Sequence, residues 1–454
     1  MPRLGILLSL AVLLGACGGL PTTASPTRPA SSAAIGSPAP IPTSALGQVI
    51  PAPGSASAVY GPNPAAIVVA IDPGHGGCLD WGSPNPFDNV EAKAEKAITL
   101  GIGLALRERL AAAGITVVMT RDTDQALAGD LYPALGCQGP PLRDVNGDGM
   151  AGFGPDFPPQ TLARDELQAR LDLANVARAD LLLSIHVDAI ADADGNPIPI
   201  ARTETFYTDE TPWGASSTRH LAQLIQQQVV GAMAGAGYAR QDRGINAHNF
   251  YLVAPPLLKE TAERPNRWAQ PTRGALMPSV LCEVASNTLA AEDRLIISAD
   301  GQARIADGLV AGLAGYFAQR PVAARIAVLQ PGVEPPPRVV PGNGPPFWAP
   351  EVGGLSRLPL KLTNTGQERW DDKLSLLVGW DRSDQPYLRT APAALERVDV
   401  AVPRLAPGES VDLELPLAVP PGARQVAWIT LGDGGPHTFA DMGSPPLQLA
   451  SRAP

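Results

Sequence analysis

The chain has 454 residues, 17% of them charged, and a formal net charge of −10 at pH 7. This length is enough for two or three domains with buried cores. The negative balance argues against a nucleic-acid partner, because binding to a phosphate backbone needs a basic face. The 49 prolines and 46 glycines are concentrated in linkers and turns.

Residues 1–17, MPRLGILLSLAVLLGAC, place a short apolar stretch after a single arginine. The stretch is too short for a comfortable membrane span and is typical of a secretory signal peptide. Its end, Leu-Gly-Ala-Cys, resembles a bacterial lipobox, which implies cleavage before Cys17 and lipidation of that cysteine. An ordinary signal peptide cut near Ala16 is the alternative. In both cases we expect an extracytoplasmic protein, and a lipidated Cys17 would anchor it to the membrane.

Residues 18–64 are mostly Pro, Ser, Ala, Thr and Gly, so they cannot bury a core and are expected to be a disordered tether. Residues 65–318 alternate strand-like and helix-like segments, which predicts an α/β domain with a single, mostly parallel sheet flanked by helices. The expected strands are AAIVVAID (65–72), ITVVMT (115–120), DLLLSIHV (180–187), ETFYT (204–208), FYLVA (250–254) and SVLCEVA (279–285). The expected helices are 95–114, 163–179, 216–233 and 302–317.

Residues 319–354 are rich in proline and are expected to be a linker. From 355 to 451 short alternating strands replace the helical pattern, which predicts an all-β sandwich. Trp370, Trp380 and Trp428 lie in or beside these strands and are most simply core residues. The segments LKLTNTGQERW and FADMGSPPLQL resemble a bacterial immunoglobulin-like domain. We expect a binding or spacer domain, because this region contains no cluster of chemically active side chains.

Three cysteines remain when Cys17 is set aside, so at most one intramolecular disulfide can form. Cys78 follows a glycine turn and Cys137 lies in a loop-like segment, which makes this pair the predicted disulfide. Cys282 lies in an apolar strand, where a thiol packs as a small hydrophobic group.

Histidines and carboxylates occur at the ends of several expected strands. His75 follows the first strand in the motif DPGHGG, His186 ends LLLSIH, and Glu283 ends SVLCE. Because ligands in an open α/β sheet collect at the carboxyl ends of the strands, we expect these side chains to meet there. A catalytic zinc ion uses three protein ligands and a water molecule. Two histidines and a carboxylate meet that need, and a further carboxylate could accept the proton of the water.

Two glutamates compete for the carboxylate ligand position. Glu91 and Glu95 lie one helical turn apart near the start of the helix 95–114, and spacing alone does not separate them. Asp72 could accept a hydrogen bond from the second ring nitrogen of a ligating histidine. The glycines around His75 would allow a tight turn and leave room beside a metal.

Six motifs occur in one order: DPGHGG, EK at a helix start, GITVVMTRDTD, R…AN…ADLLLSIHVDA, RGI and PSVLCEVASN. Over about residues 65–318 this order resembles the zinc-dependent N-acetylmuramoyl-L-alanine amidases, a cell-wall amidase family with an α/β catalytic domain. The resemblance implies that His75, Glu95 and His186 bind one zinc ion and that Glu283 is the catalytic carboxylate. The Glu-Lys pair of the family favours Glu95, with Glu91 as the alternative.

The chain departs from the family pattern near the expected site. Asp188 stands where the family usually has Asn, and the segment after Glu283 lacks the usual Gly and Phe. We expect Asp188, Asn287 and Arg243, the last in the RGI motif, to lie on the substrate side. Two insertions are present, at 125–163 and 255–277, and the family uses such insertions to gate or regulate access.

DVNGDG, at 144–149, matches the opening of a calcium loop, with Asp144, Asn146 and Asp148 at alternate positions. Pro155 at the twelfth position excludes a full EF-hand. A shorter loop that binds Ca²⁺ is one reading of the segment, and a solvated turn is the other.

The resulting hypothesis is an extracytoplasmic, zinc-dependent peptidoglycan hydrolase that cleaves the amide between N-acetylmuramic acid and L-alanine of the stem peptide. Its expected partners are peptidoglycan and, through a lipid on Cys17, the cell membrane, with the catalytic domain facing the cell wall. One alternative is a non-catalytic wall-binding protein on an amidase scaffold, and another is a zinc hydrolase of a different amide. The sequence gives no indication of the oligomeric state.

Overall fold

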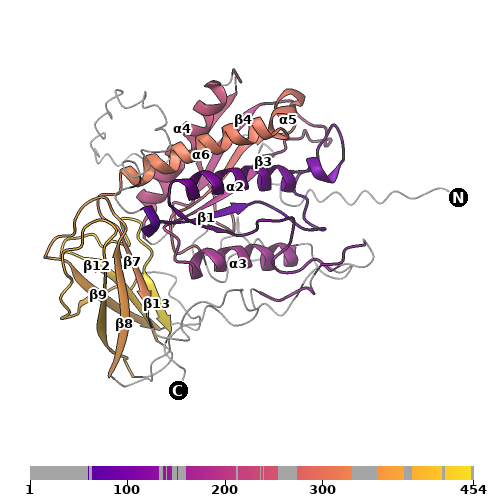
Figure 1. Cartoon of the computed structure of the whole chain (residues 1–454). Coiled ribbons are helices and arrows are strands. Elements are labelled where there is room, and N and C mark those ends of the chain that lie inside the picture. The colour runs from indigo at the N-terminus through magenta and orange to yellow at the C-terminus, as the bar shows by residue number, and fades with distance from the viewer. Residues whose placement is uncertain are drawn as a thin grey trace, which may run out of the picture. The chain divides into compact units, whose positions relative to one another are not determined.

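A computed structural model of the chain describes residues 60, 64–131, 136–139, 141–145, 151, 160–210, 213–235, 237–238, 240–253, 274–329, 355–382, 391–421 and 425–450 (Figure 1). The predicted signal peptide, Cys17, nearly all of the tether and most of the insertion 255–277 lie outside these residues. The same holds for Asn146 and Asp148 of the predicted calcium loop. Among the described residues, no helix combines the length and the apolar character that a bilayer span requires.

The first domain is built on a six-stranded sheet with the order β2-β1-β3-β6-β4-β5. β2, β1, β3 and β6 run parallel to one another, whereas β4 is antiparallel to β6 and parallel to β5. The predicted fold class, a mostly parallel sheet flanked by helices, is therefore confirmed. The strands are β1 (Val68–Pro73), β2 (Thr116–Met119), β3 (Leu181–Asp188), β4 (Arg202–Tyr207), β5 (Gln241–Ala247) and β6 (Ser279–Ser286).

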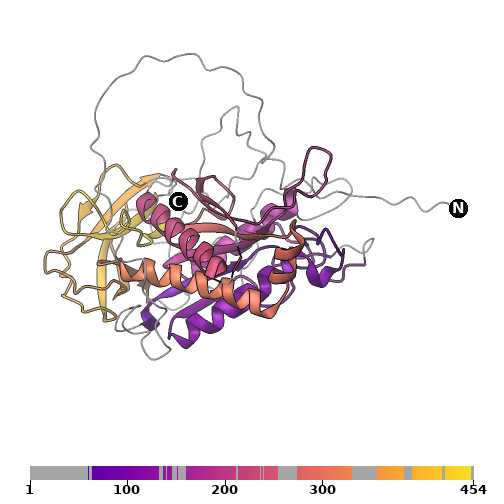
Figure 2. The same ribbon diagram turned by 90° about the horizontal axis from the view of Figure 1, so that it is seen from above.

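Helices cover both faces of this sheet, because alternate residues of its central strands point to opposite sides. Val69 and Ile71 of β1 join the core beneath α2, α4 and α6, and Val68 and Ala70 pack with α3. Figure 1 shows α2 and α3 on opposite sides of β1, and Figure 2 shows α2, α6 and α4 side by side. The helical elements are η2 (Pro64–Ala66), η3 (Glu91–Lys93), α2 (Glu95–Ala112), α3 (Gln160–Val176), α4 (Ala215–Gly235), α5 (Ala290–Ile296) and α6 (Ala299–Ala318).

The residues of α2 explain why this segment is a helix that lies on the sheet. Ile98, Ile102, Leu106 and Leu110 recur every four residues, and all are buried. Gly114 has a φ of 85° just beyond the helix, a conformation that ends helices and favours glycine. The first residues of the helix lie close to the turn after β1, because the N–H of Lys96 donates to the carbonyl of Trp81 at 3.2 Å.

One strand lies earlier in the chain than the sequence pattern predicts. The apolar run FYLVA, 250–254, predicts a strand, but residues 251–253 form a turn, and the strand β5 is at Gln241–Ala247. β5 is an edge strand whose residues are mostly exposed, so it lacks the apolar run of a central strand. Tyr251, Leu252 and Val253 are apolar because this turn is buried, at 5% exposure or less.

The C-terminal part contains two antiparallel sheets, β10-β9-β12-β13 and β11-β8-β7, with a shared hydrophobic core that includes Leu360 and Ile429. Of the three tryptophans predicted as core residues, Trp370 and Trp428 are buried, and Trp380 is partly buried against this core. β7 lies in the range predicted as a linker, yet it pairs with β8, because Ala324 and Ile326 alternate toward this core. The strands are β7 (Ala324–Val328), β8 (Leu355–Asn364), β9 (Ser375–Arg382), β10 (Glu396–Arg397), β11 (Ser410–Ala418), β12 (Gln425–Gly432) and β13 (Leu447–Ala450).

Candidate metal centre

The turn after β1, residues 74–82, which we call the His75 turn, carries the first candidate ligand. Its start is tied to β3, because the N–H of Gly74 donates to the carbonyl of Ile185 at 2.9 Å. His75 has a φ of 62°, and Gly76 and Gly77 also have positive φ values. A Cβ on Gly74 would lie 2.4 Å from the His186 ring, so only glycine fits there. The glycines thus allow the two histidines to approach each other.

Three side chains predicted as metal ligands come together at this edge of the sheet. His75 Nε2 lies 3.2 Å and His186 Nδ1 lies 3.0 Å from Oε1 of Glu95. One ligand atom from each of the three residues lies within 4.8 Å of the others. Glu95 is also held by two backbone N–H groups, from Val187 at 3.0 Å and Ser83 at 2.8 Å. Two nitrogen donors and one carboxylate oxygen therefore surround a common point.

Electrostatics keep the carboxylate of this group ionised. Burial alone would raise the pKa of Glu95, but the adjacent His75 and His186 outweigh burial and hold the pKa well below its usual range. Burial would likewise lower the pKa of His75, yet the carboxylates of Asp80 and Glu95 raise it well above its usual value. The cluster favours a positive charge at its centre, as a cation site requires.

The choice between the two glutamates rests on their positions. Glu91 lies in η3 before α2, and its exposed carboxylate pairs with Nζ of Lys96 at 2.5 Å. Glu95, the first residue of α2, is 3% exposed and faces both histidines. The geometry therefore favours Glu95 over Glu91.

A carboxylate that the sequence analysis did not identify contacts the ring of His75. Oδ1 of Asp80 lies 2.7 Å from Nδ1 of His75. Asp72, the residue expected in such a position, instead accepts hydrogen bonds from Thr120 at 2.6 Å and Ser184 at 2.6 Å and pairs with Arg170 at 2.9 Å. Asp72 is a residue of the strand β1, whereas Asp80 belongs to the His75 turn. The N–H of Gly76 donates to the carbonyl of Asp80, which closes this turn.

Glu283 lies on the strand next to His186 and is its register partner across β3 and β6. Its Oε2 atom is buried and has no hydrogen-bond partner among the described residues. Burial, together with the nearby Asp188 and Glu95, raises the pKa of Glu283 well above its usual value. A carboxylate with a free lone pair and raised proton affinity is suited to accept a proton.

A basic residue that the sequence analysis did not identify lies beside Glu283. Arg202, at the start of β4, forms a close ion pair with Asp188 and lies 3.9 Å from Glu204. Glu204 is the register partner of Glu283 across β4 and β6. Because β4 runs against β6, its first residues reach the same sheet edge as the last residues of β6. Asp188 is thus paired with Arg202, although burial outweighs this charge and raises the pKa of Asp188, and the motif order alone does not reveal the pairing.

The other two residues expected on the substrate side differ in exposure. Asn287 is fully buried; its side-chain N–H donates to the carbonyl of Pro84 at 3.4 Å, and its Oδ1 atom has no hydrogen-bond partner among the described residues. Arg243 is exposed on β5, and its positive charge acts on the carboxylate of Glu204. Arg243 is thus exposed to solvent, whereas Asn287 is enclosed by the protein, and the expected role of each on the substrate side stays a prediction.

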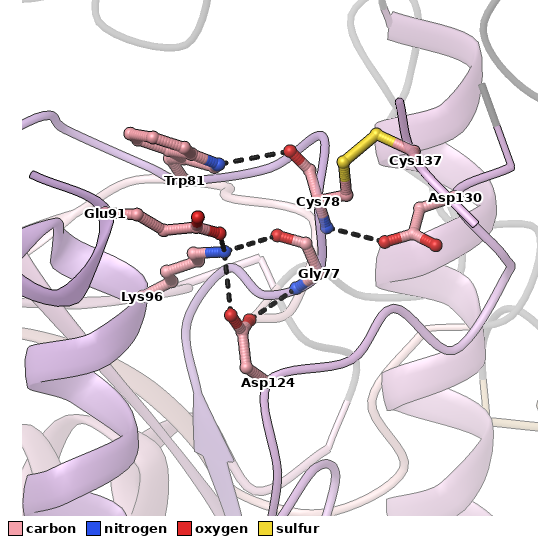
Figure 3. The surroundings of a disulfide bond; sticks show 8 residues. All are labelled: Gly77, Cys78, Trp81, Glu91, Lys96, Asp124, Asp130 and Cys137. Carbon is pink, nitrogen blue, oxygen red and sulfur yellow. Dashed lines mark hydrogen bonds and ion pairs between the residues drawn. A yellow bond between two sulfur atoms is a disulfide. The ribbon is translucent and has the colours of Figure 1, made fainter. Parts of the chain in front are cut away.

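The predicted disulfide between Cys78 and Cys137 is present, with 5.7 Å between its Cα atoms (Figure 3). It joins the His75 turn to a residue of the insertion 125–163. Cys282 is buried and not disulfide-bonded, as expected. The disulfide therefore lies three residues from a candidate metal ligand.

Comparison with known proteins gives the same family as the motif order. A family model for N-acetylmuramoyl-L-alanine amidase matches residues 69–315. The N-acetylmuramoyl-L-alanine amidase LytC of Bacillus subtilis is 34% identical over 100 residues, which are 21% of this chain and 18% of LytC. The uncharacterized Bacillus subtilis protein YqiI is 29% identical over 154 residues, which are 34% of this chain and 59% of YqiI. The matched region thus spans less than two thirds of either relative.

Among solved structures, the chain is similar to an N-acetylmuramoyl-L-alanine amidase from Clostridium difficile 630. The identity is 26%, the TM-score is 0.37, and the match covers 56% of this chain and 98% of that one. The amidase AmiC2 of Nostoc punctiforme is 21% identical with a TM-score of 0.35, and the match covers 55% of this chain and 97% of that one.

Proposed function

The chain belongs to the N-acetylmuramoyl-L-alanine amidase family, and from this premise we propose that it is a zinc-dependent peptidoglycan hydrolase. It would cleave the amide between the lactyl group of N-acetylmuramic acid and L-alanine of the stem peptide. The observation that carries the proposal is the convergence of two histidines and an ionised carboxylate beside a buried carboxylate oxygen without a partner.

His75, Glu95 and His186 would hold the metal ion. Two imidazole nitrogens and one carboxylate oxygen are a donor set that suits zinc and leaves a fourth position open for water. A zinc ion bound there would polarise the scissile carbonyl and lower the pKa of the attacking water. The hydrogen bond between Asp80 and His75 Nδ1 supports this assignment, because it leaves Nε2 of the ring free to bind the metal.

Glu283 would act as the general base and then as the general acid. Its unpartnered Oε2 accepts a proton from the water as the oxygen attacks the carbonyl carbon. The same carboxyl group then gives that proton to the leaving nitrogen as the C–N bond breaks. The products are a carboxylate on the lactyl group and a free amine on L-alanine. Arg202 would hold Asp188 in an ion pair, which opposes the rise in the pKa of Asp188 that burial causes.

The experiment combines metal analysis with digestion of purified cell-wall sacculi. Wild-type protein is expected to retain about one zinc ion and to release free stem peptides that mass spectrometry identifies. Glu283→Gln should keep the zinc and lose about 100- to 10,000-fold in kcat, since it removes the proton acceptor. His186→Ala should lose both zinc and activity.

Glu108→Gln, a change of the same chemistry on the exposed face of α2, is the matched control and should behave as wild type. Binding to sacculi without zinc or cleavage would favour a wall-binding protein and contradict the proposal. Cleavage of sugars or cross-links, or of a different amide, would contradict the proposed bond.

We further propose that the protein acts outside the cytoplasm, anchored by a lipid on Cys17, with residues 18–64 as the tether. A cell-wall substrate and the lipobox-like segment support this location. The C-terminal sheets, proposed to be an immunoglobulin-like domain, would serve as a binding or spacer module. Metabolic labelling with a fatty acid, compared between wild type and Cys17→Ser, tests the anchor.

A further inference from the structure

The His75 turn is held from outside by residues that follow β2. The N–H of Gly77 donates to Oδ1 of Asp124 at 2.8 Å, and the N–H of Cys78 donates to Oδ2 of Asp130 at 2.5 Å. The disulfide to Cys137 adds a covalent link at the same place (Figure 3). Two consecutive backbone groups of the turn thus depend on side chains from another segment.

The turn is also held from the side of α2. Nζ of Lys96 donates to the carbonyl of Gly77 at 2.6 Å and pairs with Oδ2 of Asp124 at 2.8 Å. The Lys96 side chain is 1% exposed, and the residue follows Glu95, a proposed ligand. Both backbone groups of Gly77 are therefore bonded, and the network reaches both sides of the proposed zinc site.

The carboxylate of Asp130 is closely packed against its neighbours. A Cβ on Gly77 would lie 2.5 Å from its Oδ2, and a Cβ on Gly139 would lie 1.5 Å from its Oδ1. The residue is 5% exposed. Its carboxylate is thus packed between two glycines while it accepts the N–H of Cys78. The start of the insertion 125–163 fits closely onto the turn.

This contact matters because the turn has an unfavourable backbone. His75 has a φ of 62°, which costs a residue other than glycine free energy unless the surroundings hold it in place. A turn released from its restraints would sample other conformations, in which the imidazole no longer faces Glu95.

We propose that Asp130 and the Cys78–Cys137 disulfide are positioning residues for His75, and that they raise the affinity of the site for zinc. The inference rests on the proposed zinc site. The first part of the insertion 125–163 would then support the metal site.

The test measures the zinc dissociation constant of the full chain by competition with a chromophoric chelator, on samples that circular dichroism shows to be folded. The Cys78→Ser/Cys137→Ser double variant and Asp130→Ala are each expected to raise the constant about tenfold or more, in the range found when a contact behind a ligand is lost. Activity should return at saturating zinc. Asp122→Ala, which changes an exposed aspartate after β2, is the control and should leave the constant unchanged.

A second measurement uses wild-type protein treated with a phosphine, which reduces the disulfide to two thiols and is itself oxidised to the phosphine oxide. The reductant should weaken zinc binding by wild type and have no effect on the double serine variant. If the double serine variant does not fold, zinc binding by wild type before and after reduction gives the comparison.

The outcomes separate the two proposals. If wild type binds zinc and the folded variants bind it equally well, the positioning role is overturned and the proposed function stands. If wild type binds no zinc, the metal centre itself is overturned, and the positioning role falls with it.

Discussion

Oδ1 of Asp80 lies 2.7 Å from Nδ1 of His75, while Nε2 of the same ring lies 3.2 Å from Oε1 of Glu95. Because an ionised carboxylate only accepts hydrogen bonds, Nδ1 carries the proton and donates it to Asp80. This hydrogen bond fixes the plane of the ring and directs Nε2 toward Glu95, and on binding of a metal ion it would favour the tautomer in which Nε2 carries the lone pair.

Removal of Asp80 should therefore weaken zinc binding. Asp80→Ala is expected to raise the zinc dissociation constant by about 10- to 100-fold, since the ring loses its orienting partner. Chelator competition measures the constant. Asp88→Ala, which removes an exposed carboxylate that pairs with Lys93, is the control and should have no effect. Equal affinities for the two variants would contradict the role of Asp80.

Glu95 and Glu91 offer a matched pair of substitutions. Glu95→Gln should lose bound zinc, because it removes a charged ligand that faces both histidines. Glu91→Gln should retain it, because it affects only a half-exposed ion pair with Lys96. Metal content after gel filtration, determined by mass spectrometry of the element, distinguishes them. Zinc loss in Glu91→Gln alone would reverse the assignment.

Gly74→Ala should disrupt the metal centre while leaving the rest of the fold in place. The new Cβ would lie 2.4 Å from the His186 ring, so the ring must move away from Glu95. Zinc affinity is expected to fall at least about tenfold. Gly231→Ala in α4 meets no atom within 4 Å and should stabilise its helix by up to about 1 kcal/mol. Isothermal titration and thermal unfolding measure the two effects; unchanged zinc affinity in Gly74→Ala would contradict the close contact.

The ionised carboxylate of Asp72 should make the free energy of unfolding of the zinc-free protein fall at acidic pH. Burial alone would raise its pKa, but Arg170 and the hydroxyls of Ser184 and Thr120 outweigh burial and lower the pKa. A pKa that is lower in the folded than in the unfolded protein stabilises the fold above the unfolded value of about 3.9. That stabilisation is lost as the pH falls from there through the folded pKa.

Asp72→Asn should therefore destabilise the protein by about 1–3 kcal/mol at pH 7, because the buried Arg170 loses one of its two carboxylate partners and keeps only Glu166. The difference from wild type should shrink as the pH falls below about 4. Urea unfolding of zinc-free protein at pH 7, 5 and 3.5 measures this. Asp122→Asn, at an exposed site, should show neither effect. A difference that stays constant with pH would contradict the role of the ionised Asp72.

Local patterns in the sequence predict the central elements of the catalytic domain. Burial of an element on one or both faces produces a pattern of apolar residues in its sequence. The apolar runs of β1, β3 and β6 and the four-residue spacing in α2 are such patterns. Because parallel strands end at one sheet edge, the strand pattern alone is enough to place together the histidines that end β1 and β3. The disulfide is predictable from the odd number of cysteines and the loop positions of two of them.

The pattern of apolar residues gives a wrong prediction where a strand is exposed or where a buried segment is not a strand. The edge strand β5 is mostly exposed and has no apolar run, whereas the apolar segment at 250–254 includes a buried turn. In the same way, β7 lies among prolines, and only its pairing with β8 shows that it belongs to the β-sheet core.

The sequence by itself determined which types of side chain gather at the sheet edge, because the strand ends and the DPGHGG turn are local features. The motif resemblance favours Glu95 over Glu91, and the tertiary structure places Glu95 beside both histidines; only the tertiary structure decided between Asp72 and Asp80 as the partner of His75. These choices depend on how η3, α2 and the turn lie against one another. That arrangement arises from contacts between residues distant in the chain, such as Lys96 with Asp124 and Cys78 with Cys137, which no spacing along the sequence encodes.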